Sequence, residues 1–181
     1  MPRAREDGGG RSGVRVTADG RGAATVDTGL PLFDRLLERL AAAARFDLVL
    51  EVEPGDVEAA VVTAGTSLGS ALAGPLRADG AQGHGSGVML SAEAIAHVVL
   101  EVADDPLVVS NVDLTEARIG GIGTDVVRTF LERLADEAGI VLHVRLLNGT
   151  NSQHVLEAIF KALGVALSQA CTSPSKGEQS G

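Results

Sequence analysis

The pentapeptide Leu37-Glu-Arg-Leu-Ala41 occurs again, unchanged, at Leu131-Glu-Arg-Leu-Ala135. Farther along the chain, Leu68-Gly-Ser-Ala-Leu72 returns as Leu163-Gly-Val-Ala-Leu167, one residue out of step with the first pair. A single inserted loop residue would produce that shift. Because both matches follow the same order, they indicate an internal repeat. The sequence therefore predicts a tandem duplication.

The first half predicts two strands, a helix, a third strand and a second helix. β-forming residues at 14–19 and 23–29 flank a glycine-bearing turn, as in a hairpin. Apolar residues then recur at helical spacing over 31–46. Alternating residues at 46–53 predict a strand that stops at a Pro-Gly pair, and residues 57–72 predict a second helix.

The second half repeats this order after a glycine-rich stretch at 80–87, which is expected to be a loop. Its expected elements are strands in 93–102 and 106–114, a helix in 123–139, a strand in 140–148 and a helix in 151–170. The predicted fold is therefore α+β. A duplicated ββαβα unit forms two four-stranded sheets, each backed by two helices.

Domain boundaries follow from this reading and from the polar ends of the chain. Residues 1–13 are rich in Gly and Arg and lack periodicity, so they are expected to be a disordered tail. The first repeat is expected over 14–85 and the second over 86–170. Residues 171–181 are expected to be a flexible tail.

Composition narrows the classes of function. The net charge of −9 argues against a nucleic-acid partner, and the 2% aromatic content argues against base stacking. The single cysteine, Cys171, excludes an intrachain disulfide and fits a reducing compartment. The N-terminal stretch lacks the apolar segment of a signal peptide, and the uncharged run at 59–76 is too weakly apolar to span a bilayer. A soluble, cytoplasmic protein without a membrane partner is expected.

The last predicted helix carries His154 and Glu157 near its start, three residues apart and therefore on one face. Such a pair is more often a solvated surface pair than a pair of metal ligands. His143, in the middle of a predicted strand, is likewise most simply a structural histidine. In the duplicated helix, Glu58, Ala59 and Val62 take the positions of Gln153, His154 and Glu157.

Residues 115–167, which include "RIGGIG" and "NSQHVLEAIFKAL", resemble the imidazoleglycerol-phosphate dehydratase family, lyases of histidine biosynthesis. That family carries a similar "ER-IGG", a "TLH" strand and "N-HH--EA-FKA-A-AL". In the first half, "DGRGAATVDTGLPLFDRLLERLA" resembles the family's "DG-G---V-TGI-FLDHML". The resemblance covers most of residues 14–170.

The resemblance implies an activity and an assembly. The implied reaction is the dehydration of imidazole glycerol phosphate to imidazole acetol phosphate. The implied assembly is a homo-oligomer, trimer-based and up to 24 subunits, with two manganese ions in each active site at subunit interfaces. There the two metals would act as Lewis acids on a phosphorylated imidazole substrate.

The resemblance also implies metal ligands, position by position. His143 stands at the family's "LH" position, His154 at the second histidine of "HH", and Glu157 at the carboxylate. Arg35 stands where the family's "DHM" has its histidine, and a permanent cation there would repel a metal ion. Because a site needs about three or four protein ligands per ion, at most one manganese ion is expected here, or none.

Substrate and phosphate contacts are implied in the same way, while no catalytic residue is assigned. Glu93 matches the glutamate of the family's "DEA", and Lys161 matches the lysine of "FKA". Ser175 and Lys176, in "SPSKG", match the family's tail "PSTKG". Against these matches, Asp105 stands where the family's "SGRP" has an arginine, which reverses the charge.

Two hypotheses stay open. The chain is a divergent dehydratase that uses whatever metal the remaining ligands hold. Alternatively, it is a catalytically inactive paralogue that kept the scaffold and serves as an assembly subunit or a small-ligand binder.

Overall fold

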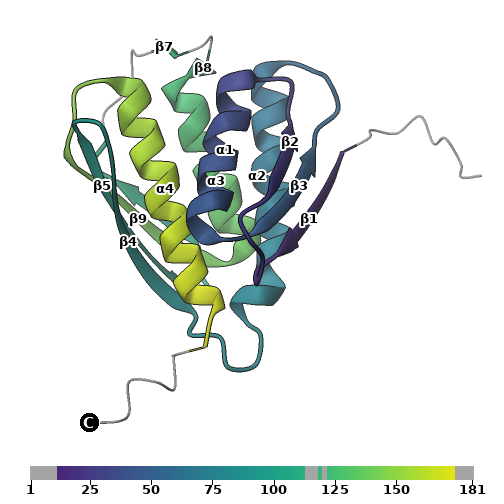
Figure 1. Cartoon of the computed structure of the whole chain (residues 1–181). Helices are drawn as coiled ribbons and strands as arrows, with labels where there is room; N and C mark the ends of the chain where they lie inside the picture. The colour runs from purple at the N-terminus through teal and green to yellow at the C-terminus, as the bar shows by residue number, and fades with distance from the viewer. Residues whose placement is uncertain (1–11, 113–117, 120–121, 174–181) are drawn as a thin grey trace, which may run out of the picture.

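The computed structural model describes residues 12–112, 118–119 and 122–173, and it places a layer of helices between two β-sheets (Figure 1). The first half contains β1 (Gly13–Thr17), β2 (Ala24–Asp27), α1 (Pro31–Ala44), β3 (Asp47–Glu51) and α2 (Val57–Leu76). The second half contains β4 (His84–Ser91), β5 (Ala94–Val102), β6 (Leu107–Ser110), β7 (Arg118–Ile119), β8 (Ile122–Gly123), α3 (Thr124–Ala138), β9 (Ile140–Asn148) and α4 (Ser152–Cys171).

β7 and β8 pair in a small two-stranded sheet of their own, and the two larger sheets repeat one topology. In the first sheet, with order β1-β3-β2, β3 is antiparallel to β1 and parallel to β2. The two strands expected to form a hairpin at 14–29 are therefore not paired with each other, and that expectation was wrong, because β3 lies between them. In the second sheet, with order β4-β5-β9-β6, β9 is likewise antiparallel to β5 and parallel to β6. The predicted α+β fold with two sheets and four helices is therefore confirmed. The second sheet has the expected four strands, whereas the first sheet has three within the described residues.

The fourth strand of the second sheet is β4, and it lies where the sequence was expected to form a glycine-rich loop. Gly85 and Gly87 alternate with outward-facing residues and are buried. A Cβ at either glycine would collide with the backbone carbonyl of Ala166 or of Ala162 in α4. The glycines therefore let α4 approach the strand closely, and the expectation of a loop from their number alone was wrong.

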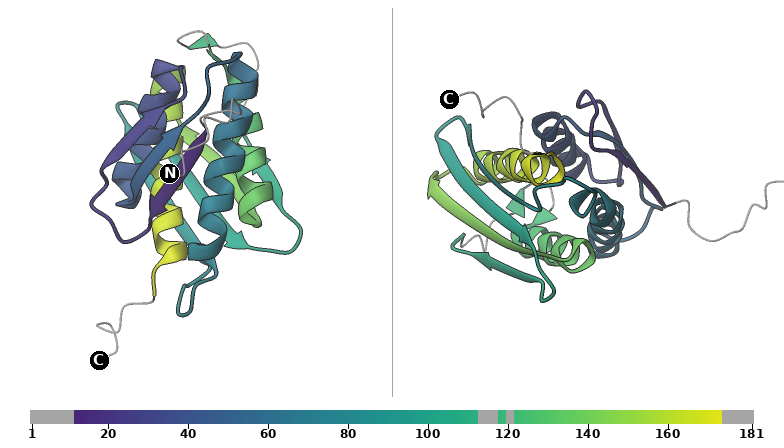
Figure 2. Two further views of the ribbon diagram at one scale, coloured as in Figure 1. Left: turned by 90° about the vertical axis from the view of Figure 1, so that its right-hand side faces the viewer. Right: turned by 90° about the horizontal axis from the view of Figure 1, so that it is seen from below.

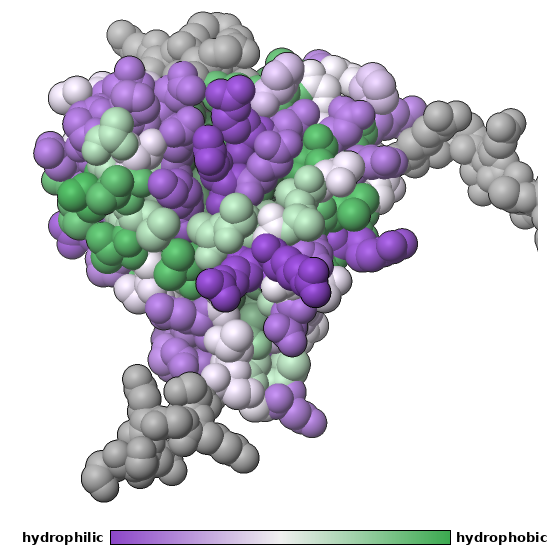
Figure 3. Space-filling model, viewed as in Figure 1, coloured by the Kyte–Doolittle hydropathy of each residue, from purple (hydrophilic) through white to green (hydrophobic). Residues whose placement is uncertain are grey.

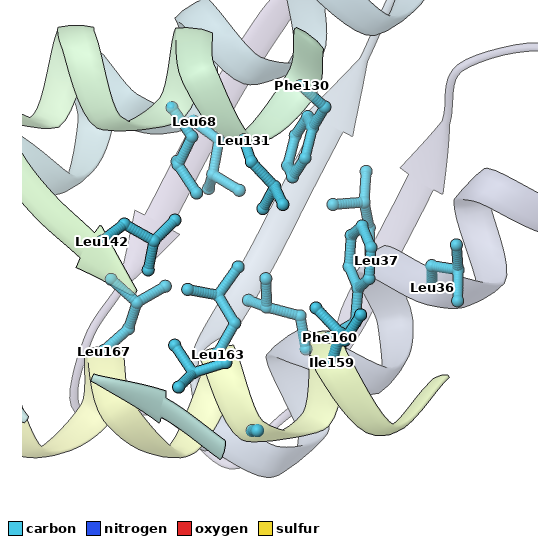
Figure 4. Close-up of a cluster of buried hydrophobic side chains, with 14 of the residues drawn as sticks. Leu36, Leu37, Leu68, Phe130, Leu131, Leu142, Ile159, Phe160, Leu163 and Leu167 are labelled. Carbon is cyan, nitrogen blue, oxygen red and sulfur yellow. The ribbon is translucent and has the colours of Figure 1, made fainter. Parts of the chain in front are cut away.

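The four helices lie between the sheets, so that each sheet has one covered face and one outer face (Figure 2). The main helix contacts cross between halves, with α2 packed on α3 and α1 packed on α4. Phe33, Phe130 and Phe160 meet in this layer with ring centroids 5.1 to 6.2 Å apart. Figure 4 shows Phe130 and Phe160 among the leucines that fill the space between the helices. The core is otherwise aliphatic, as its composition requires.

The run at 59–76 was expected to be too weakly apolar to span a bilayer, but α2, which contains it, is long and apolar enough to do so by length and composition. Eight of its residues are buried, and it packs along α3. Its apolar character is therefore explained by its place in the helix layer.

The ends of the repeats differ slightly from the expected boundaries. β1 begins at Gly13, and the Ser12 hydroxyl accepts a hydrogen bond from the Glu53 N–H at 3.1 Å, so these residues belong to the first sheet. α4 continues to Cys171. Residues 1–11 and 174–181 lie outside the described part of the chain.

Candidate functional site

The start of α4 is fixed by a side-chain cap. The Asn151 carboxamide oxygen accepts a hydrogen bond from the His154 N–H at 3.1 Å. Such a cap satisfies one of the N–H groups that a helix leaves unpaired at its start. It also places His154 and Glu157 on consecutive turns of one helix face.

His154 is paired with Glu93 in the turn between β4 and β5. The imidazole Nδ1 lies 2.6 Å from Glu93 Oε2, and Glu93 Oε1 accepts hydrogen bonds from the N–H groups of Asn151 and Thr150 at 2.8 and 3.4 Å. Hydrogen bonds from the Asn151 N–H, from the backbone N–H of Glu93 itself and from the His154 imidazole lower the pKa of Glu93 to about 2. A carboxylate that accepts several such bonds is held in its charged form.

Glu157, one turn later, is engaged by two neighbours. The Ser91 hydroxyl donates to Glu157 Oε2 at 2.7 Å, and the Gln153 carboxamide donates to Oε1 at 3.5 Å. Burial acts to raise the pKa of Glu157. These hydrogen bonds, together with the charges of Arg39 and His154, outweigh it and leave the pKa below its ordinary value.

Lys161 completes this set of contacts, because its ammonium group donates to the backbone carbonyl of Leu90 at 2.7 Å. We call the set the turn clasp: Leu90, Ser91, Glu93, His154, Glu157 and Lys161. It fastens the β4–β5 turn to the first three turns of α4. Four of the residues predicted for metal or substrate binding therefore lie together, but each has a partner within the chain.

His143 lies apart from the turn clasp. Its neighbours along β9, Leu142 and Val144, are buried against the helix layer, while His143 is exposed. Because side chains alternate between the two faces of a strand, His143 lies on the outer face of the sheet, opposite α4. Within one chain, His143 and His154 therefore cannot share a metal ion.

A cavity of about 530 Å³ opens beside His143 on the outer face of the second sheet. Its polar lining residues are Gln82, His84, Ser86, Glu101, His143 and Gln169. On the same face, the Ser86 hydroxyl lies 2.8 Å from His97 Nε2. An alternating reading of β4 would have revealed that His84 and Ser86 share this face.

The corresponding start of α2 in the first half has the same cap but different side chains. The Asp56 carboxylate accepts the Ala59 N–H at 2.7 Å, as Asn151 does in α4. Ala59 and Val62, at the positions of His154 and Glu157, carry no metal-binding atom. Among the described residues, no three His, Cys, Asp or Glu side chains gather closely enough to hold a metal ion. The donor set of one chain therefore does not fit a pair of manganese ions.

Two predicted site residues are not described by the structure, and one residue of the turn clasp was not predicted from the sequence. Ser175 and Lys176, predicted as phosphate contacts, lie outside the described residues. Ser91 was not singled out from the sequence, because its bond to Glu157 joins positions 66 residues apart. Ser91 could have been predicted only if the turn after it had been expected to lie beside the start of α4.

Comparison with known proteins places the chain in a family. The family model described as imidazoleglycerol-phosphate dehydratase matches residues 28–167. The chain is 40% identical over 159 residues to "Imidazoleglycerol-phosphate dehydratase" of Syntrophobacter fumaroxidans, covering 86% of this chain and 81% of the relative. It is 37% identical over 171 residues to the protein of that name from Roseobacter denitrificans, covering 91% and 87% of the two chains.

The fold is also that of solved structures with this name. The imidazoleglycerol-phosphate dehydratase of Staphylococcus aureus superposes with a TM-score of 0.83 at 24% identity, covering 91% of this chain and 95% of that one. The protein from Pyrococcus furiosus gives a TM-score of 0.78 at 22% identity, covering 92% and 93%. With its sheets, its helix layer and its sequence all matched over most of their length, the chain belongs to the imidazoleglycerol-phosphate dehydratase family of histidine biosynthesis.

Proposed function

We propose that this chain is a catalytically inactive member of the family that serves as an assembly subunit in the cytoplasm. The turn clasp carries the proposal. His154 and Glu157, two of the three implied metal ligands, bind the β4–β5 turn, and the third, His143, lies on the other face of the sheet. The side chains of His154 and Glu157 thus contact Glu93 and Ser91 of the same chain.

The outer face of the second sheet supports the role in assembly. Six large apolar side chains on its four strands are 40 to 59% exposed: Val88, Leu90, Val99, Leu107, Val109 and Leu147. Apolar surface is visible on the side of the molecule where β4 and β5 lie (Figure 3). These side chains share the outer face with polar residues such as His84, Ser86 and His143. Exposed apolar area bordered by polar residues is typical of a protein–protein interface. The proposed occupant is another copy of this chain, which gives a homo-oligomer.

Self-assembly is tested by light scattering during size-exclusion chromatography. The double variant Val88→Glu, Leu107→Glu should elute at a lower mass than the unmodified chain. Val49→Glu is the control, because Val49 is 42% exposed on the first sheet. A monomeric unmodified protein, or a double variant with unchanged mass, would contradict the proposed interface.

A second candidate function is a dehydratase that acts on a phosphorylated imidazole with one manganese ion. The Glu93–His154 pair favours it, because a histidine held at Nδ1 keeps Nε2 for a ligand, and such carboxylate pairs are common behind metal-binding histidines. The remaining donors of that ion would have to come from another subunit.

Complementation separates the two functions. The chain is expressed in a histidine auxotroph that lacks the dehydratase, and purified protein is analysed for manganese after refolding with the metal in excess. An inactive subunit neither restores growth nor retains metal. Growth without added histidine would refute the proposed inactivity. Co-migration with a dehydratase that has all its ligands would extend the assembly role to mixed oligomers.

A further inference from the structure

We propose that α1 carries a binding site for a small oxyanion, formed by the guanidinium groups of Arg35 and Arg39. A cavity of about 390 Å³ lies between the start of β2 and the outer side of α1. It is lined by Gly22, Ala24, Arg35, Glu38, Arg39 and Ala42. This cavity shares no lining residue with the turn clasp or with the cavity beside His143, although the charge of Arg39 also acts on Glu157 of the turn clasp. The proposal does not depend on the proposed function.

The floor of the cavity consists of small residues packed tightly on backbone. Gly22 has φ of 85°, and a Cβ at this position would lie 3.1 Å from Ala42 Cα. A larger residue at Gly22 would therefore be strained and would fill the space. With Ala24 and Ala42 beside it, the floor leaves room for a ligand that the longer side chains of the rim can reach.

The rim carries two cations without partners in the described part of the chain. Arg35 and Arg39 are exposed and one helical turn apart, and neither makes an ion pair or a side-chain hydrogen bond there. Like charges at this spacing destabilise a helix by about 0.2–0.5 kcal/mol. In α3, by contrast, Arg128 bonds Glu132 at 3.1 Å. An anion between Arg35 and Arg39 would remove the repulsion.

The chemistry of the rim selects the ligand class. A guanidinium is permanently charged and presents a planar pair of donors that matches phosphate and carboxylate oxygens. Two such groups on one side of a small cavity suit an anion with several oxygens, such as a phosphate monoester or a small polycarboxylate. Glu38 lines the same cavity and opposes the anion, so it weakens the site that the two arginines form.

Calorimetric titration of the full chain tests the site. The probes are inorganic phosphate, glycerol 3-phosphate and citrate, at an ionic strength kept constant with sodium chloride. Replacement of both arginines, Arg35→Gln with Arg39→Gln, should weaken the binding of the preferred probe at least tenfold. Glu38→Gln should strengthen it severalfold. The probe that binds most tightly distinguishes a phosphate ester from free phosphate or a carboxylate.

Arg133→Gln is the matched control, because Arg133 is an exposed arginine at the position in α3 that corresponds to Arg39. It should leave binding unchanged. The proposal is overturned if no probe binds, if the double variant binds as tightly as the unmodified chain, or if Arg133→Gln weakens binding equally. Circular dichroism confirms that the variants are folded, and these surface replacements should leave the spectrum unchanged.

Discussion

Gly164 of α4 lies directly against the backbone carbonyl of Leu40 in α1. The duplicated residues make the same contact with the halves exchanged, because Gly69 of α2 lies against the carbonyl of Leu134 in α3. These four positions belong to the two pentapeptide pairs that repeat in the sequence. The repeated motifs are therefore the places where a helix of one half meets a helix of the other.

Replacing Gly69 by alanine should lower the free energy of unfolding despite the higher helix propensity of alanine. A Cβ there would lie 2.7 Å from the Leu134 carbonyl oxygen and 2.8 Å from Glu137 Cβ, so α2 and α3 would have to move apart. Overpacking of this kind costs about 1–3 kcal/mol. Urea denaturation of Gly69→Ala measures it. Gly74→Ala, in the same helix, is the control, because a Cβ there would meet nothing within 4 Å, and it should not destabilise the chain.

Phe130 should be the most costly of the core aromatics to truncate, because its ring lies closer to Phe33 and Phe160, at 5.1 and 5.6 Å, than those two lie to each other, at 6.2 Å. We expect Phe130→Ala to lose about 3–5 kcal/mol of stability and Phe130→Leu clearly less. Guanidinium denaturation of both variants gives the two values. Equal losses would mean that the lost aromatic contacts, and not the cavity, are the source of the effect.

The secondary structure of this chain was largely predictable, because α1, α3 and α4 carry strong helical periodicity and the duplicated motifs give the order of elements. β4 was not, since its glycines were read as loop residues when they are buried beneath α4. The number of strands in the first sheet and the placement of all four helices between the sheets depend on contacts between halves, which local patterns do not encode.

The candidate site was predictable in its residues but not in its geometry. The resemblance pointed to Glu93, His154, Glu157 and Lys161, which do lie together. Their partners in the β4–β5 turn are 61 to 71 residues away along the chain, so no local pattern reveals them. The position of His143 on the outer face follows from strand alternation, once the buried neighbours are known.

The pH dependence of stability should report the Glu93–His154 pair. The pKa of Glu93 is about 2 in the folded chain, against an ordinary value of 4.5. The folded state therefore favours the carboxylate, and the unfolded state binds more protons between these values. The stabilisation is present above pH 4.5 and is lost as the pH falls toward 2. Denaturation at several pH values should show a shallower loss for Glu93→Gln than for the unmodified chain. Glu51→Gln, at the exposed end of β3, should leave the slope unchanged.

Ser91→Ala should loosen the β4–β5 turn, because it removes the hydroxyl that donates to Glu157 and leaves a half-buried carboxylate with fewer partners. Hydrogen bonds to charged groups are worth about 1.5–3 kcal/mol, and exposure of the pair reduces the expected loss to about 1 kcal/mol. Hydrogen exchange should quicken at the amides of Thr150 and Asn151, which bond Glu93 in the same turn.

The stability and exchange measurements are made with and without added manganese. If the turn clasp is structural, the metal changes neither the stability nor the exchange of the unmodified chain. Stabilisation by manganese that disappears in Glu157→Gln would instead identify Glu157 as a working metal ligand.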